Sequence, residues 1–112
     1  MKIHKGLSLE RWFTFSLFEQ LANVGTDIER VINWKKKENI DYSEKAFARA
    51  LELLDLTILD DKNKGGKLRE LLRMREILID YFVYDNQYNS NDKMWQDYFY
   101  QFNYAAAIQN GK

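Results

Sequence analysis

The sequence contains no cysteine, no proline and a single histidine. Without cysteine, a disulfide framework, a thiolate metal site and a cysteine nucleophile are all excluded, and this fits a reducing cytoplasm. The absence of proline removes the commonest helix breaker and agrees with an all-helical chain. The one histidine, His4, lies in the N-terminal tail without an orienting partner, so we expect a solvated side chain there.

The chain also lacks an excess of charge of either sign and any long apolar run. Lys plus Arg and Asp plus Glu number 17 each, so no net field attracts nucleic acid or a membrane, although a local patch could still bind nucleic acid. No run approaches the roughly 18 apolar residues of a membrane span, and residues 1–6 lack the apolar core of a signal peptide. We therefore expect a cytoplasmic protein that does not enter a membrane.

Aromatic residues, in contrast, are abundant. Three Trp, seven Tyr and seven Phe exceed what the core of a 112-residue protein needs, so we expect some of these rings to face a partner. A chain of this length forms one domain, residues 1–112, that can bury a core but still gains stability from oligomerisation.

Four segments keep the three-and-four spacing of apolar residues that is typical of amphipathic helices, at about residues 8–37, 42–59, 67–84 and 91–108. Ser8 and Asp41 are the expected N-caps of the first two, and the polar stretch 60–66 is the clearest loop. Short connections make consecutive helices neighbours. The sequence therefore predicts an all-α, single-domain antiparallel four-helix bundle in up-down-up-down order.

Gly25 interrupts the middle of the first predicted helix, at a cost of about 1 kcal/mol relative to alanine. With Ala22 one turn away it makes a low spot on the helix surface. We interpret it as a packing notch or mild kink, with access for a ligand as the alternative. Asn23, Asp27 and Arg30 lie away from the apolar stripe and are expected to form a solvated face.

Arg75 is the leading candidate for a binding residue, because it continues the apolar stripe of the third helix and so lies on or beside the core. An unpaired guanidinium there would be costly, and Asp55 is the expected partner across the bundle. The pair either fixes helix register or belongs to an anion or nucleotide pocket with Arg69 and Arg73. A small-ligand enzyme using Asp55, Glu52 and Arg75 in a polar cavity is a weaker alternative.

Several aromatic residues are candidates for contact with partners. The helical pattern exposes Trp34, which could stack on a base, pack under a loop or form a subunit contact, while the neighbouring Lys35–Lys37 are expected to be ordinary solubilising charge. On the last helix, Trp95, Tyr100 and Tyr104 form either a protein interface or the closed end of the bundle.

The sequence predicts no metal site and no cofactor. Di-iron bundles require Glu-x-x-His motifs on two helices, whereas the only histidine is His4. The pair Gly65-Gly66 lacks the Lys-Ser/Thr that completes a phosphate-binding P-loop.

Two segments, residues 17–25 (LFEQLANVG) and 49–57 (RALELLDLT), resemble a group of small uncharacterised prokaryotic all-helical proteins, a resemblance that implies no activity. More distantly, the layout is similar to the HEPN four-helix bundles, which pair with nucleotidyltransferases or act as ribonuclease toxins. Their ribonuclease members carry an Arg followed four to six residues later by His. No histidine follows Arg69, Arg73 or Arg75, so ribonuclease activity is not implied.

These observations favour a non-enzymatic helical interaction module that forms a homo-oligomer or a small protein complex. The alternative is an RNA- or nucleotide-binding HEPN-like bundle without ribonuclease activity, which would use Arg69, Arg73, Arg75 and Trp34.

Overall fold

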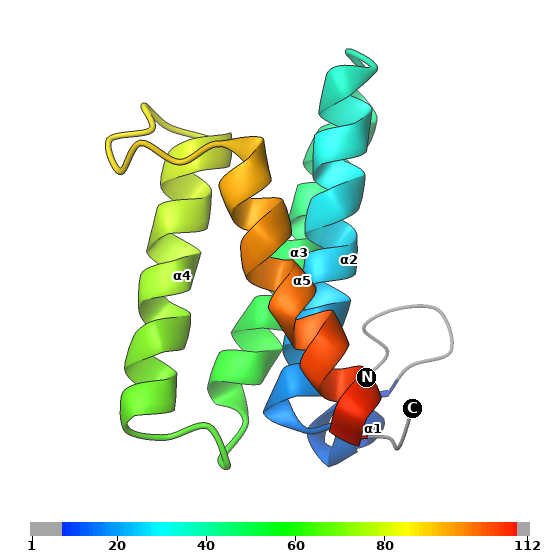
Figure 1. The fold of residues 1–112 in the computed structure, drawn as a ribbon, viewed down its shortest axis with the longest axis vertical. Coiled ribbons are helices and arrows are strands. Elements are labelled where there is room, and N and C mark those ends of the chain that lie inside the picture. The colour runs from blue at the N-terminus through cyan, green and yellow to red at the C-terminus, as the bar shows by residue number, and fades with distance from the viewer. Residues whose placement is uncertain (1–7, 110–112) are drawn as a thin grey trace.

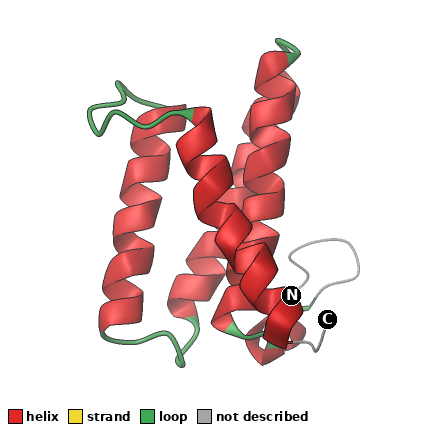
Figure 2. Ribbon diagram, in the orientation of Figure 1, coloured by secondary structure: helices red, strands yellow, loops and turns green. Residues whose placement is uncertain are grey.

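The computed structural model describes residues 8–109, which form five α-helices (Figure 1). These are α1 (Leu9–Thr14), α2 (Leu17–Lys36), α3 (Ile40–Leu59), α4 (Gly66–Phe82) and α5 (Asp92–Gln109). No strand occurs within this range, as Figure 2 shows, so the prediction of an all-α fold is confirmed. The prediction for His4 and the N-terminal tail lies outside the described residues.

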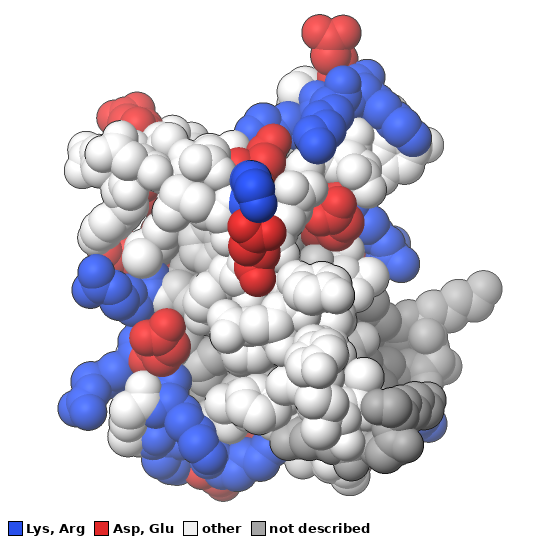
Figure 3. Space-filling view, viewed as in Figure 1, with Lys and Arg blue, Asp and Glu red and all other residues white. Residues whose placement is uncertain are grey.

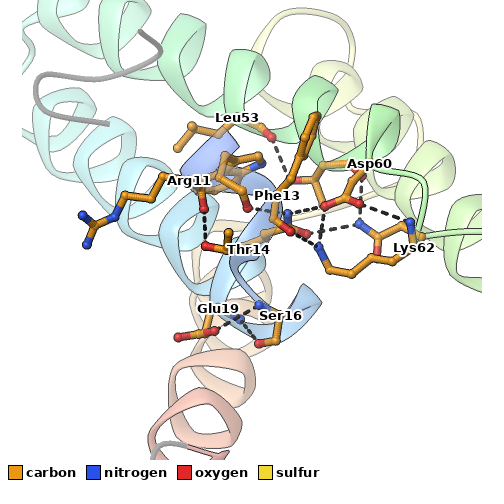
Figure 4. A network of polar contacts seen from close by, with 12 residues as sticks. Arg11, Phe13, Thr14, Ser16, Glu19, Leu53, Asp60 and Lys62 are labelled. Atoms are coloured by element: carbon orange, nitrogen blue, oxygen red, sulfur yellow. Dashed lines mark hydrogen bonds and ion pairs between the residues drawn. The ribbon is translucent and has the colours of Figure 1, made fainter. Parts of the chain in front are cut away.

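The prediction of a single helix over residues 8–37 is wrong, because the helix is interrupted at Phe15 and Ser16 and forms α1 and α2 instead. Ser8 caps α1 as expected. Ser16 then opens α2 with a capping box: its hydroxyl accepts from the Glu19 N–H at 3.1 Å, and the Glu19 carboxylate accepts from the Ser16 N–H at 3.0 Å (Figure 4). The apolar spacing continues across this break, so periodicity alone could not reveal it.

The other helices begin and end within two residues of their predicted limits, but one cap differs. Asn39 caps α3, its side-chain oxygen accepting from the Tyr42 N–H at 3.1 Å, so the prediction of Asp41 as the cap is wrong. Asn91 holds the start of α5 by accepting from the Met94 N–H at 2.8 Å. Each cap satisfies a backbone donor that the helix itself leaves unpaired.

Helix α2 packs along both α3 and α5, and α4 packs on α3 (Figure 1). The core between them is made of fully buried apolar side chains from every helix except α5, namely Trp12, Val24, Ile28, Val31, Ile32, Leu53, Leu54, Leu71 and Leu78. Trp95 and Phe99 add the rings of α5 to the same cluster. Burial of one such side chain contributes about 1.5–3 kcal/mol, so this cluster is the main source of stability.

The packing notch predicted at Gly25 is present. Phe99 of α5 lies so close that a Cβ on residue 25 would be 2.6 Å from the Phe99 Cβ and 2.9 Å from its Cγ. The glycine thus lets α5 approach the backbone of α2. The nearby polar row is not wholly solvated as expected, since Asp27 is buried and accepts from the Arg30 Nη1 at 2.9 Å.

The stretch 60–66 was expected to be an exposed loop, and for Asp60 and Asn63 this is wrong because both are buried. Gln20 of α2, itself fully buried, donates from Nε2 to the Asp60 Oδ2 at 2.9 Å. The Asn63 Nδ2 donates in turn to the Gln20 Oε1 at 3.1 Å and to the Thr57 carbonyl at 2.9 Å. The loop is therefore part of the packed structure.

The same network reaches α1, as Figure 4 shows. Gln20 Nε2 also donates to the Trp12 carbonyl at 3.0 Å, and Lys62 donates from Nζ to the Phe13 carbonyl at 3.4 Å while forming an ion pair with Asp60. These bonds reach carbonyls at the end of α1, of which that of Trp12 also accepts from the Phe15 N–H at 3.2 Å. The network therefore anchors the short first helix to the loop between α3 and α4.

The loop between α4 and α5 is organised around Asp80, which is buried. Its carboxylate accepts from the backbone N–H groups of Gln87, at 2.9 Å, and of Tyr88, at 3.0 Å. Asn86, in the left-handed region at φ 55°, exchanges side-chain hydrogen bonds with the backbone of Ser90. Such bonds between short polar side chains and nearby backbone fix the loop without apolar packing.

Candidate functional site

The three arginines predicted to form one binding site are not brought together. Arg75 does pair with Asp55, its Nε donating to Oδ1 at 2.6 Å, but the side chains are 37% and 51% exposed. Arg75 is thus partly buried beside the core and pairs with Asp55 as expected, but the pair reaches the surface, where such pairs are worth about 0–1 kcal/mol. Arg69 is exposed, and Arg73 lines a different surface, a cleft between α4 and α5.

The residues of the enzymatic alternative share this exposed setting. Glu52 is exposed on α3, as are most of Asp55 and part of Arg75. The three side chains therefore lie on the outer surface of the helices and not in a polar cavity inside the bundle.

The sequence predicts an exposed Trp34, whereas the structure shows it partly buried against the core cluster. Tyr42 meets its ring edge-on with centroids 4.8 Å apart, and the Lys37 Nζ lies 5.1 Å from its centroid. In Figure 3, positive side chains gather over α4 and, separately, over the end of α2. The aromatic and arginine parts of the predicted nucleic-acid site therefore do not share one surface.

Lys35 was expected to be solubilising charge, yet it joins the ends of three helices. Its Nζ donates to the Tyr81 hydroxyl at 3.1 Å and to the Asp92 Oδ1 at 3.3 Å, and the Tyr81 hydroxyl donates to the same Oδ1 at 2.7 Å. Partial burial lowers the pKa of Lys35, but the bond to Tyr81 and the Asp92 carboxylate outweigh it, so the net pKa is raised. No local spacing in the sequence signals this contact.

Helix α5 carries the remaining candidates, and they separate into buried and exposed groups. Trp95 is 7% exposed and stacks on Phe99 with centroids 5.9 Å apart, so it offers little surface to a partner, and its role as an interface residue stays a prediction. Tyr100 and Tyr104 are 68% and 63% exposed. With Ile108, also exposed, they follow one another at four-residue spacing and form a single stripe, the α5 face.

No charged residue occurs between Tyr98 and Gln109. In Figure 3, the lower half of α5 accordingly coincides with a broad uncharged area, below the charged side chains near the start of the helix. Tyr100 also borders a groove of about 500 Å³ between α2 and α5, whose wall includes Thr26 and Asn103. The α5 face thus combines exposed rings with an absence of charge, and the groove beside it is also lined by Glu29, Arg30 and Asp97.

The cleft between α4 and α5 is smaller, about 300 Å³, and was not predicted. Arg73 and Met74 line it from α4, and Met94, Trp95 and Tyr98 line it from α5. The Tyr98 hydroxyl donates to the Glu70 Oε1 at 3.4 Å, and burial together with this carboxylate holds the pKa of Tyr98 far above its usual range. Tyr98 is therefore a neutral hydrogen-bond donor at physiological pH.

Two other features are absent from the described residues. Among residues 8–109, no three His, Cys, Asp or Glu side chains gather in a way that could hold a metal ion. None of the helices in the described part of the chain combines the length and apolarity needed to cross a membrane.

Comparison of the chain with models of protein families, with curated proteins and with solved structures gives no match, so the resemblances inferred from residues 17–25 and 49–57 stay predictions.

Proposed function

We propose that this chain is a non-enzymatic helical interaction module that assembles with a second copy of itself through the α5 face. The carrying observation is the exposure of Tyr100 and Tyr104 on the part of α5 that follows Asp97, where the helix has no charged residue. Cores of protein interfaces are enriched in tyrosine and depleted of charged residues. The α5 face has this composition on the outside of the molecule.

A second copy is the favoured partner because a twofold interface presents the same patch twice. A charged patch would repel its own copy, whereas Tyr100 and Tyr104 carry hydroxyl groups that both donate and accept hydrogen bonds. The groove beside Tyr100 offers a complementary hollow for a ring from the other copy. A 112-residue domain also gains stability by burying further surface in an oligomer.

For the scaffold, we propose an up-down-up-down bundle of α2 to α5, with the short α1 closing one end. The short loops between consecutive helices support this order. In such a bundle one side of α5 packs on α2 through Phe99, which leaves the α5 face directed outward.

The test is the native mass of the protein, measured by native mass spectrometry and sedimentation over a range of concentrations. We expect a dimer for the wild-type chain and a monomer for the double variant Tyr100→Ser/Tyr104→Ser. Since a central tyrosine can contribute about 2 kcal/mol or more, removal of both should weaken the dimer by about 100-fold or more.

Tyr84→Ser provides the matched control, because Tyr84 is 71% exposed but lies beyond the end of α4, away from the α5 face. This variant should keep the wild-type mass. A wild-type monomer at all concentrations, or an unchanged dimer in the double variant, would overturn the proposal.

Binding of RNA or a nucleotide stays a prediction. Arg69 and Arg73 lie one turn apart on α4 and could contact one phosphate strand, but Arg75 is engaged by Asp55. Loss of a salt-sensitive association on Arg73→Gln would support this alternative, and absence of any RNA binding at low salt would remove it. The cytoplasmic location likewise stays a prediction.

A further inference from the structure

The cleft between α4 and α5 exists because the two helices pack on different neighbours. Helix α4 packs on α3, and α5 packs on α2. The resulting space of about 300 Å³ is at the lower end of the range for small-molecule pockets, about 300–1,000 Å³. Its walls include Met74, Ile77, Met94 and Trp95. Methionine side chains adapt to the shape of an apolar guest, so these walls suit a small flat or aliphatic body.

Two residues that line this cleft carry a hydrogen-bond donor without a partner. Trp95 is buried, and its indole Nε1–H is enclosed without a hydrogen-bond acceptor. Arg73, exposed on α4, forms no hydrogen bond or ion pair with any residue of the described chain. Trp95 lines the cleft with its ring and also lines the groove between α2 and α5. A guest that supplies oxygen acceptors would satisfy the guanidinium of Arg73.

The acidic side chain at the cleft is already engaged. The Glu70 carboxylate accepts from the Tyr98 hydroxyl at 3.4 Å and keeps its negative charge, because this hydroxyl is neutral. Arg73 is the cationic residue that lines the cleft, and it is the group that attracts an anionic guest. Arginine also matches the planar geometry of a carboxylate with two parallel hydrogen bonds.

We propose that this cleft is a binding site for a small apolar monocarboxylate. The apolar body lies between Met74, Met94 and Trp95, and the carboxylate binds the guanidinium of Arg73. This inference goes beyond the proposed assembly and does not depend on it, because neither Tyr100 nor Tyr104 lines the cleft.

The experiment is a titration of the full chain, labelled with ¹⁵N, with 1-naphthoate, a two-ring carboxylate. The three tryptophans give three indole N–H signals, which single Trp→Phe variants assign. We expect the Trp95 signal to shift in a saturable way, with a Kd of roughly 1 mM or tighter for a ligand of this size. Trp12 is the internal control, because its indole N–H is also enclosed and unpaired but does not line the cleft, so its signal should stay in place.

Two probes with the same rings test the charge of the guest. The neutral 1-naphthalenemethanol and the cationic 1-naphthylmethylammonium should each bind about tenfold more weakly than 1-naphthoate, as expected for loss of a charge-assisted hydrogen bond. Equal binding of all three would overturn the assignment of a carboxylate.

The matched variants are Arg73→Gln and Arg69→Gln, which remove the same charge from neighbouring turns of α4. Both side chains are exposed, so both variants should keep the helical content of the parent. Arg73→Gln should weaken 1-naphthoate about tenfold and abolish its advantage over the neutral alcohol, whereas Arg69→Gln should stay within about twofold. Equal effects of the two variants, or no saturable shift of Trp95 in the parent, would overturn the proposal.

Discussion

Replacement of Gly25 by alanine should have two opposing effects on the free energy of unfolding. In an isolated helix this change is stabilising, because alanine exceeds glycine in helix propensity by about 1 kcal/mol. In this protein the new methyl group would enter the space that Phe99 of α5 occupies. Its Cβ would lie 2.6 Å from the Phe99 Cβ and 3.1 Å from the Cδ1.

The steric effect should outweigh the propensity. Favourable contacts between carbon atoms lie at about 3.5–4.0 Å, so the closest pair overlaps by roughly 1 Å. The Phe99 Cβ is attached directly to the backbone, so a rotamer change cannot relieve the overlap and α5 itself must move away from α2. Insertion of a methyl group into a packed core costs about 1–3 kcal/mol, and the lack of a flexible neighbour favours the upper value. The expected net loss in the free energy of unfolding is therefore about 2 kcal/mol.

Urea unfolding followed by both far-ultraviolet circular dichroism and tryptophan fluorescence measures this loss. Agreement of the two signals tests for a two-state transition, and several protein concentrations separate folding from any assembly. A loss of 2 kcal/mol should lower Tm by roughly 8 °C in a domain of this size. Gly66→Ala is the matched control: Gly66 is the first residue of α4, and no atom lies within 4 Å of its added Cβ. That variant should be stabilised by about 0.4–1 kcal/mol.

The reasoning fails if Gly25→Ala is as stable as the wild type or more stable. Such a result would mean that α2 and α5 separate at little cost, and that Gly25 is not required for their close approach. Destabilisation of Gly66→Ala by a similar amount would also count against it, because the loss could then not be assigned to contact with Phe99.

Three further measurements test polar interactions. Gln20→Ala should lower the free energy of unfolding by about 2–4 kcal/mol, because it leaves a buried Asp60 carboxylate without one of its donors; a loss below about 1 kcal/mol would contradict this. A double-mutant cycle on Asp55 and Arg75 should give a coupling below about 1 kcal/mol, as for other exposed pairs, and a coupling above about 2 kcal/mol would require a buried pair. Burial raises the pKa of Asp60, but its bonds with Lys62 and Gln20 outweigh this and set the pKa below the ordinary 3.8. The ionised carboxylate therefore stabilises the fold above about pH 4, and this contribution is lost as the pH falls through the pKa of Asp60 in the folded state. In Asp60→Asn the free energy of unfolding should consequently fall less steeply between pH 4 and lower pH than in the wild type. An unchanged slope would refute this.

The helices could be predicted from the sequence because each buries a stripe of its own residues, and such a stripe appears directly as spacing. The notch at Gly25 was likewise visible, as a glycine inside a helical pattern. The break before α2 was missed because the apolar spacing runs through it. A local signal was present, however, since Ser16 and Glu19 have the separation of a capping box.

Other features depend on contacts between distant parts of the chain. Asn63 and Asp60 are buried because Gln20, 43 and 40 residues away, brings an amide to them, and a polar loop gives no sign of such a partner. The separation of Arg73 from Arg75 was accessible in principle, since residues two positions apart project about 200° apart on a helix. Which of the two would face the cleft depends on the packing of α4 against α3, and this is not encoded in the local sequence.

Both proposals concern α5, so the contact that holds this helix bears on each of them. Phe99 is locked against Gly25 on one side of the helix and stacks on Trp95 at 5.9 Å. Trp95 lines the cleft, and Tyr100, the next residue after Phe99, opens the α5 face. A displacement of Phe99 would therefore move the indole in the cleft and the exposed ring together. The close approach at Gly25 thus stabilises the core and also fixes the position of the helix that carries both proposed binding surfaces.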